Sequence, residues 1–179
     1  MNSYTIRPAT PADAAIIAEH RVAMFRDMGE IPTEALGAQL LAESTTALTV
    51  WLRDQSYIGW LAIDDRGAVI AGAGVHIKSQ LPRISHDGAR VVTTPMPLAV
   101  NVYTEPERRG QGIARALVNV LMKWAAGQGT DRVVLHASDA GRPLYLSLGF
   151  EPTNEMRWFP YCDNCAGGQD AAKHIGRPT

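Results

Sequence analysis

Hydrophobic residues in the second half of the chain change from strand-like to helix-like spacing across a glycine-rich segment. Residues 97–104 are mostly apolar and are followed by Glu105-Pro106, which predicts a strand that ends there. From residue 113 onward apolar side chains recur three and four positions apart, which predicts a helix that buries one face. Gly127-Gln128-Gly129 ends that helix, and residues 132–137 predict a second apolar strand. The helix face consists of Ile113, Ala116, Leu117, Val120, Leu121 and Trp124.

The first half of the chain predicts two helices among strands. Thr10 and Pro11 are a capping threonine and a first-turn proline, so a helix is expected to begin there and to end before Gly29. Thr33 can cap a second helix that runs through Thr46 or beyond. Strands are predicted over 3–7, 57–63 and 69–77, the last two joined by the polar turn 64–67.

Two polar segments fall outside this core pattern. They are Met28–Glu34, between the predicted helices, and Ser79–Pro97, which holds Arg83, His86, Asp87 and Arg90. The second segment is too long for a tight turn, and long loops of this kind are often functional. A substrate-lining loop, a contact in a homodimer and a solvated loop remain alternatives.

The glycine-rich segment carries the most specific chemistry in the chain. It reads Arg108-Arg109-Gly110-Gln111-Gly112-Ile113-Ala114 and opens the predicted helix. The first N–H groups of a helix have no partner within the helix, and the helix dipole makes this end positive. Small residues uncover these N–H groups, and the arginines, with Arg115, add positive charge. The segment therefore predicts a site for a phosphate-bearing ligand.

The spacing of the small residues narrows the choice of ligand. A dinucleotide-binding Gly-x-Gly-x-x-Gly/Ala turn counted from Gly110 would need its last small residue at 115, where the chain has arginine. No Gly-Lys-Ser/Thr ending follows either, so a nucleoside-triphosphate loop is disfavoured as well.

Two motifs resemble the GCN5-related N-acetyltransferase (GNAT) family. Arg109-x-x-Gly112-x-Ala114 is similar to its Arg/Gln-x-x-Gly-x-Gly/Ala signature, and Leu144-Tyr145-x-x-Leu148-Gly149-Phe150 resembles an element that follows its fifth strand. The resemblance covers roughly residues 97–155. It implies an α/β (α+β) GNAT fold with a mixed, mainly antiparallel central sheet flanked by helices on both faces, in the order β-α-α-β-β-β-α-β-α-β.

The same resemblance implies an activity. It indicates an N-acetyltransferase that moves an acetyl group from acetyl-CoA to a primary amine by direct attack in a ternary complex. Tyr145 holds the position of the general acid, and a phenol of pKa about 10 can protonate a thiolate of pKa about 8.5 in a sheltered site. In the family the strand before the turn splays from its neighbour and binds the acyl donor through its backbone. The implied acetyl-CoA contacts are Val102, Tyr103, Thr104, Arg109, Gly110, Gln111, Gly112, Ile113, Ala114, Arg115 and Ser138.

The residues do not identify the general base. His136, Glu105, His76 and a chain of water molecules are the alternatives, since Val133, Val134 and Leu135 stand where family members commonly carry a glutamate. For this reason a non-catalytic acyl-CoA-binding or regulatory module on the same fold is the alternative function. A small-molecule amine and a peptide amine both remain open as acceptors.

Composition excludes several other classes of function. The 179 residues carry a formal net charge of −1, which gives no reason to expect nucleic acid or an anionic membrane as a partner. Without a signal segment or an apolar span, a cytoplasmic protein is expected. Cys162 and Cys165, with His174, supply too few ligands for a zinc site, so no metal is expected. We therefore expect one domain over residues 1–159 and a mobile tail over 160–179.

Overall fold

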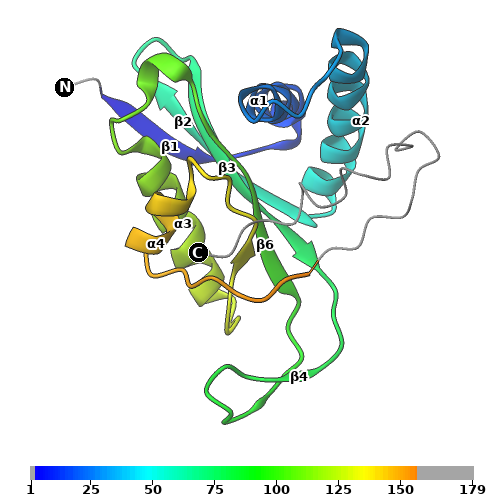
Figure 1. Cartoon of the computed structure of the whole chain (residues 1–179), viewed down its shortest axis with the longest axis vertical. Helices are drawn as coiled ribbons and strands as arrows, with labels where there is room; N and C mark the ends of the chain where they lie inside the picture. The colour runs from blue at the N-terminus through cyan, green and yellow to red at the C-terminus, as the bar shows by residue number, and fades with distance from the viewer. Residues whose placement is uncertain (1–2, 157–179) are drawn as a thin grey trace, which may run out of the picture. The chain divides into compact units, whose positions relative to one another are not determined.

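The computed structural model describes residues 3–156 and is built on a five-stranded sheet (Figure 1). The spatial order is β1-β2-β3-β6-β7, in which only β6 and β7 run parallel and all other neighbours are antiparallel. The predicted mixed, mainly antiparallel sheet is confirmed. Its strands are β1 (Tyr4–Pro8), β2 (Tyr57–Asp64), β3 (Val69–Lys78), β6 (Met96–Thr104) and β7 (Val134–Leu135).

Helices cover both faces of this sheet (Figure 1). Helices α1 (Ala14–Asp27) and α2 (Glu34–Arg53) pack on one face, and α3 (Ile113–Gly127) packs on the other. Side chains along β2 point alternately to the two faces of the sheet, so this strand contributes to the hydrophobic core on each face. Tyr57 and Leu61 face α1 and α2, while Trp60 and Ala62 face α3. The structure therefore has the two-sided layering that the resemblance implied.

The predicted starts of the first two helices are both observed. Asp13 ends a 3₁₀ turn (η1, Pro11–Asp13), and its carboxylate accepts hydrogen bonds from the Thr10 N–H at 2.7 Å and the Thr10 hydroxyl at 2.8 Å. The Arg7 guanidinium binds the same carboxylate and, as the main cause, lowers the pKa of Asp13 to about 2. Thr33 Oγ1 accepts from the Leu36 N–H at 3.3 Å, which caps α2.

Two segments differ from the sequence prediction. The expected loop 79–97 contains a small hairpin of β4 (Arg83–Ile84) and β5 (Val91–Val92), whose strands are too short to leave a pattern in the sequence. Arg83 pairs with the Asp131 carboxylate and thereby ties this hairpin to the segment after α3. The strand expected over 132–137 is reduced to the two residues of β7, because only Val134 and Leu135 pair with β6.

The chain after β6 forms a 3₁₀ turn, η2 (Pro106–Arg108), before α3, and a short helix, α4 (Arg142–Ser147), after β7. The compact unit that contains the sheet and its helices ends at Gly149. Residues 151–156 are exposed and contain no helix or strand, so the last strand of the expected order does not begin within them. The predicted tail 160–179, with Cys162, Cys165 and His174, lies outside the described residues. No helix within residues 3–156 is long and apolar enough to span a membrane.

Candidate functional site

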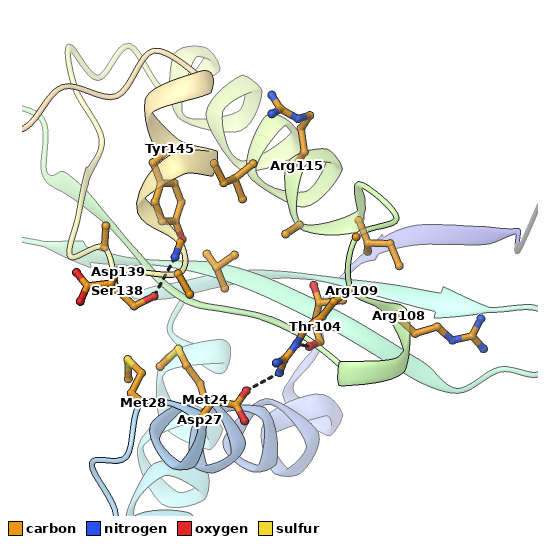
Figure 2. A pocket seen from close by; sticks show the side chains of 18 of the residues that line it. Met24, Asp27, Met28, Thr104, Arg108, Arg109, Arg115, Ser138, Asp139 and Tyr145 are labelled. Carbon is orange, nitrogen blue, oxygen red and sulfur yellow. Dashed lines mark hydrogen bonds and ion pairs between the residues drawn. The ribbon is translucent and has the colours of Figure 1, made fainter.

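A cavity of about 920 Å³ opens where α1, β6, α3 and α4 approach one another (Figure 2). One wall consists of the end of β6, the glycine-rich turn and the segment that leads into α4. The opposite wall consists of the last turn of α1 and the residues after it. The cavity therefore brings together segments that are more than a hundred residues apart in the sequence.

Strand β6 exposes part of its edge to this cavity. Its pairing with β7 ends at Ala99 and Leu135, yet β6 continues to Thr104. Val102 and Thr104 line the cavity in the stretch beyond the last pair. Within the described residues no strand covers this side of β6 after Ala99, because β7 ends at Leu135.

The glycine-rich turn presents its backbone N–H groups at the same place. Gly110 and Gly112 have φ angles of +73° and +79°, which an L-residue with a side chain rarely adopts. The flanking Arg109 and Ala116 N–H groups donate to the carbonyls of Pro106 and Gly112. Among residues 3–156, none accepts a hydrogen bond from the N–H groups of residues 110–115. These N–H groups stand at the positive end of α3 and suit a diphosphate.

Each of the three arginines of this region has a protein partner. All three line the cavity, but the Arg108 guanidinium donates to Asp64 at 2.8 Å and the Arg115 guanidinium donates to Ser147 Oγ at 2.7 Å. Arg109 donates from Nε to the Thr104 carbonyl at 2.9 Å and also pairs with the Asp27 carboxylate. The three arginines therefore lie at the same place, as the sequence predicted, and two of them are paired there with carboxylates.

Tyr145, predicted as the general acid, lines the cavity from α4 (Figure 2). Burial raises the pKa of its hydroxyl above the ordinary value, so the phenol carries its proton at neutral pH. The ring packs closely over Gly141, where an added β-carbon would lie 3.1 Å from Tyr145 Cε2. Ser138 also lines the cavity and accepts from the Gly141 N–H at 3.2 Å.

Most of the residues predicted to bind acetyl-CoA line the cavity, but two do not. The Tyr103 ring is buried between the His20 ring, 5.0 Å away between centroids, and the Arg109 guanidinium, 5.6 Å from its ring centre. Gln111 donates to the Glu107 carbonyl at 3.3 Å. The lining residues among those predicted are Val102, Thr104, Arg109, Gly110, Gly112, Ile113, Ala114, Arg115 and Ser138.

None of the three side chains named as alternative bases lines the cavity. His76 stacks on Trp51 with ring centroids 4.5 Å apart, and His136 is exposed. Glu105 lies 3.4 Å from both the Tyr103 hydroxyl and His20 Nε2. His20 is 3% exposed, and burial lowers its pKa to about 4, so it is neutral at neutral pH.

The α1 wall contains residues that the sequence did not single out. Met24 and Asp27 come from the last turns of α1, and Met28 and Glu30 follow it. Met24 has the helical spacing of a core residue, which hid its place in the cavity. Met28 and Glu30 fall in the segment 28–34, which the sequence placed outside the core pattern, whereas no residue of 79–97, the segment for which a substrate-lining loop was an alternative, lines the cavity.

Comparisons with known proteins identify the class of this chain. The family model described as "Acetyltransferase (GNAT) family" matches residues 24–150. The chain therefore belongs to the GNAT acetyltransferase family, and it is an acetyl-CoA-dependent N-acetyltransferase. This supports the enzyme over the non-catalytic module.

Individual relatives extend the similarity over most of the chain. The aminoglycoside N(6')-acetyltransferase type 1 of Stenotrophomonas maltophilia is 28% identical over 162 residues, which is 87% of this chain and 91% of that protein. A GCN5-related N-acetyltransferase structure from Ralstonia eutropha JMP134 matches with a TM-score of 0.77 and 32% identity, covering 87% and 97% of the two chains. A predicted acetyltransferase from Clostridium acetobutylicum, solved with acetyl-CoA, matches with a TM-score of 0.74 and 25% identity, covering 88% and 96%.

Proposed function

We propose that the cavity holds acetyl-CoA along β6 and the glycine-rich turn, and that a primary amine enters along the α1 wall and attacks the acetyl group directly in a ternary complex. The observation that carries this proposal is a set of six consecutive N–H groups, those of residues 110–115. They have no acceptor among the described residues, and they lie beside a strand edge that no strand covers after Ala99. Acetyl-CoA supplies the activated acetyl thioester, and the protein aligns this thioester with the attacking amine.

The wall built from β6 and residues 110–115, here called the backbone wall, can bind both the diphosphate and the amide-containing arm of acetyl-CoA. The N–H groups of residues 110–115 match a diphosphate in charge and geometry. Beyond Ala99 the free edge of β6 offers N–H and C=O groups to the amide-containing arm, as a neighbouring strand would. Holding the donor at both ends fixes the thioester between Val102 and Tyr145 and lowers the entropic cost of reaction.

Tyr145 is the proposed general acid. When the amine nitrogen bonds to the acetyl carbon and the carbon–sulfur bond breaks, the Tyr145 hydroxyl donates its proton to the departing sulfur. Its raised pKa keeps that proton in place until the thiolate forms. The amine loses its own proton to water or to a side chain that water connects to it.

The α1 wall supports an amine acceptor with positive charge. Asp27 and Glu30 both line the cavity there, and because Asp27 is paired with Arg109, the carboxylate that attracts an incoming cation is chiefly that of Glu30. A multiply charged amine such as an aminoglycoside agrees with this wall and with the relative that acetylates a 6'-amine. We therefore propose an aminoglycoside-like amine as the first acceptor to test, and peptide amines as the second.

The test is release of free thiol from acetyl-CoA over a panel of amines, comparing the wild type with Tyr145→Phe. We expect kcat to fall about 100-fold in Tyr145→Phe, the usual contribution of a positioned acid. The dissociation constant of coenzyme A, measured by calorimetry, should stay within about threefold because the diphosphate contacts are unchanged. Tyr4→Phe is the matched control, since it removes a hydroxyl on β1 outside the cavity.

Two results would contradict this proposal separately. An unchanged kcat in Tyr145→Phe removes Tyr145 as the acid. If coenzyme A produces no heat of binding with the wild type, the assignment of the turn to the diphosphate is wrong.

A further inference from the structure

Strand β6 contains one extra residue at the point where it begins to line the cavity. Gly74 of β3 is opposite Val100, but Gly72 is opposite Tyr103, so two steps along β3 correspond to three along β6. This is a β-bulge, which bends a strand and redirects the backbone after it. The bulge includes Asn101 and follows the last β6–β7 pair, Ala99 with Leu135, by two residues.

Asn101 has the backbone conformation that such a bulge needs. Its φ angle is +54°, in the left-handed region that asparagine tolerates better than other residues with side chains. The residue is only 6% exposed, and its Oδ1 accepts a hydrogen bond from Arg21 Nη1 at 2.8 Å. A buried amide that bonds a cation resists rotation, so the side chain holds the bulge in place.

Two further residues complete this network. Tyr57 is 2% exposed on β2, and its hydroxyl lies near enough to the Asn101 side chain for that amide to oppose the rise that burial causes in the pKa of the phenol. The hydroxyl lies so close to β3 that a β-carbon at Gly74 would overlap it. On the helix side, the Arg21 guanidinium lies 4.9 Å from the Phe25 ring centre. Asn101 therefore connects β6 to α1 and to β2 at once.

Helix α1 and strand β6, which this hydrogen bond connects, each contribute residues to a different wall of the cavity. Arg21 is less than one helical turn before Met24 and less than two turns before Asp27, which belong to one wall of the cavity. Asn101 immediately precedes Val102, which belongs to the other wall. The Arg21–Asn101 hydrogen bond thus joins the two walls behind the cavity, whereas the Arg109–Asp27 pair joins them within it.

We infer that Asn101 and Arg21 are positioning residues that align the acyl donor on β6 with the amine on α1. This inference depends on the proposed function, because it assigns the two substrates to those walls. Neither side chain lines the cavity, so both act through the backbone of β6 and the placement of α1. Disturbing them changes the rate of transfer far more than the binding of the donor's diphosphate, which the turn 110–115 holds separately.

The test compares Asn101→Gly with Asn101→Asp. Glycine adopts a positive φ without strain but removes the amide, whereas aspartate keeps an oxygen for Arg21 and tolerates the same φ. We expect kcat to fall about 10- to 100-fold in Asn101→Gly, the cost of misplacing reacting groups by about an ångström. Asn101→Asp should recover most of this loss. The dissociation constant of coenzyme A should change by less than about threefold in both variants, since its diphosphate contacts are elsewhere.

Arg21→Met removes the donor of the same hydrogen bond, which lies on α1, and it replaces Asn101→Gly in the experiment if that variant does not fold. It should lower kcat to a similar degree, and the double variant should be no slower than the worse single variant, because both break one interaction. Leu48→Ala, in the α1–α2 core away from the cavity, is the control for lost stability and should keep kcat.

Two outcomes would overturn the inference. Wild-type kcat in a folded Asn101→Gly or Arg21→Met variant would show that the bond does not align the substrates. An equal loss of kcat in Asn101→Gly and Leu48→Ala would show that lost stability alone explains the effect. Failure of the proposed function is distinguishable from both, because the wild type itself would then neither bind coenzyme A nor release thiol.

Discussion

The two walls of the cavity differ in the atoms that they offer to a ligand. The wall built from β6 and residues 110–115 offers mainly backbone groups, and its small residues serve to uncover them. The α1 wall offers side chains, among them two methionines and two carboxylates. A backbone wall depends on chain geometry and leaves a motif in the sequence. A side-chain wall can change by single substitutions without changing the fold, so under the proposed function donor recognition and acceptor choice are separable.

The largest effect is expected from a substitution that disrupts the backbone wall, Gly112→Val. In Gly112→Val a β-branched residue must adopt a φ of +79°, so the turn rearranges and its N–H groups no longer converge. We expect the dissociation constant of coenzyme A to rise at least about 100-fold, the loss of two or more charge-assisted hydrogen bonds. Isothermal titration calorimetry measures it directly.

Gly129→Val is the matched control for that variant. Gly129 follows the other end of α3, has a φ of +69° and, like Gly112, has nothing within 4 Å of an added β-carbon. It should lower the melting temperature comparably and leave coenzyme A binding unchanged. Equal weakening of binding in the two variants would contradict the assignment of the turn.

A second prediction concerns the junction of the walls, where His20 of α1 packs on Tyr103 of β6. His20 has a pKa of about 4 in the folded chain and an ordinary value of 6.5, so the unfolded chain takes up the proton first as pH falls. The contribution of His20 is therefore constant above pH 6.5, and stability falls as pH drops from 6.5 to 4. The slope is at most about 1.4 kcal/mol per pH unit, or tenfold in the unfolding constant.

His20→Leu tests this dependence by removing the titrating group from the junction. The free energy of unfolding, from urea titrations at several pH values, should show a shallower slope in the variant between pH 6.5 and 4. Parallel slopes in the two proteins would mean that His20 is not the group responsible.

The smallest effect is expected from removing a single charge on the α1 wall, which tests whether that wall binds the acceptor. Glu30→Gln removes one carboxylate from the cavity, whereas Glu19→Gln makes the same change on an exposed part of α1 outside it. The KM for a cationic acceptor should rise about threefold in the first variant, since one exposed charge contributes less than about 1 kcal/mol. The KM for acetyl-CoA should stay constant in both. A KM that changes equally in the two variants would place the acceptor elsewhere.

Local features of the fold could be predicted from sequence because neighbouring residues decide them. The Thr33 cap, the strand that leads into the glycine-rich turn and the amphipathic helix after it all follow from short patterns and are observed. The partners of Arg108 and Arg109 could not be predicted, because Asp64 and Asp27 are 44 and 82 residues away in the chain.

The bulge in β6 was hidden for a different reason. Residues 97–104 read as one continuous strand, and nothing next to Asn101 indicates that it takes a positive φ. Its conformation depends on Arg21 and Tyr57, which reach it from other elements. Side chains whose role depends on distant partners are therefore the part of the site that only the structure reveals.

The overlap between Tyr57 and position 74 limits the routes by which this enzyme can evolve. A side chain larger than hydrogen at 74 is incompatible with the tyrosine ring that occupies that space. Only after Tyr57 has been replaced by a shorter residue does alanine at 74 become acceptable, so the order of the two substitutions matters. A lineage that keeps the tyrosine is thereby confined to glycine on the neighbouring strand.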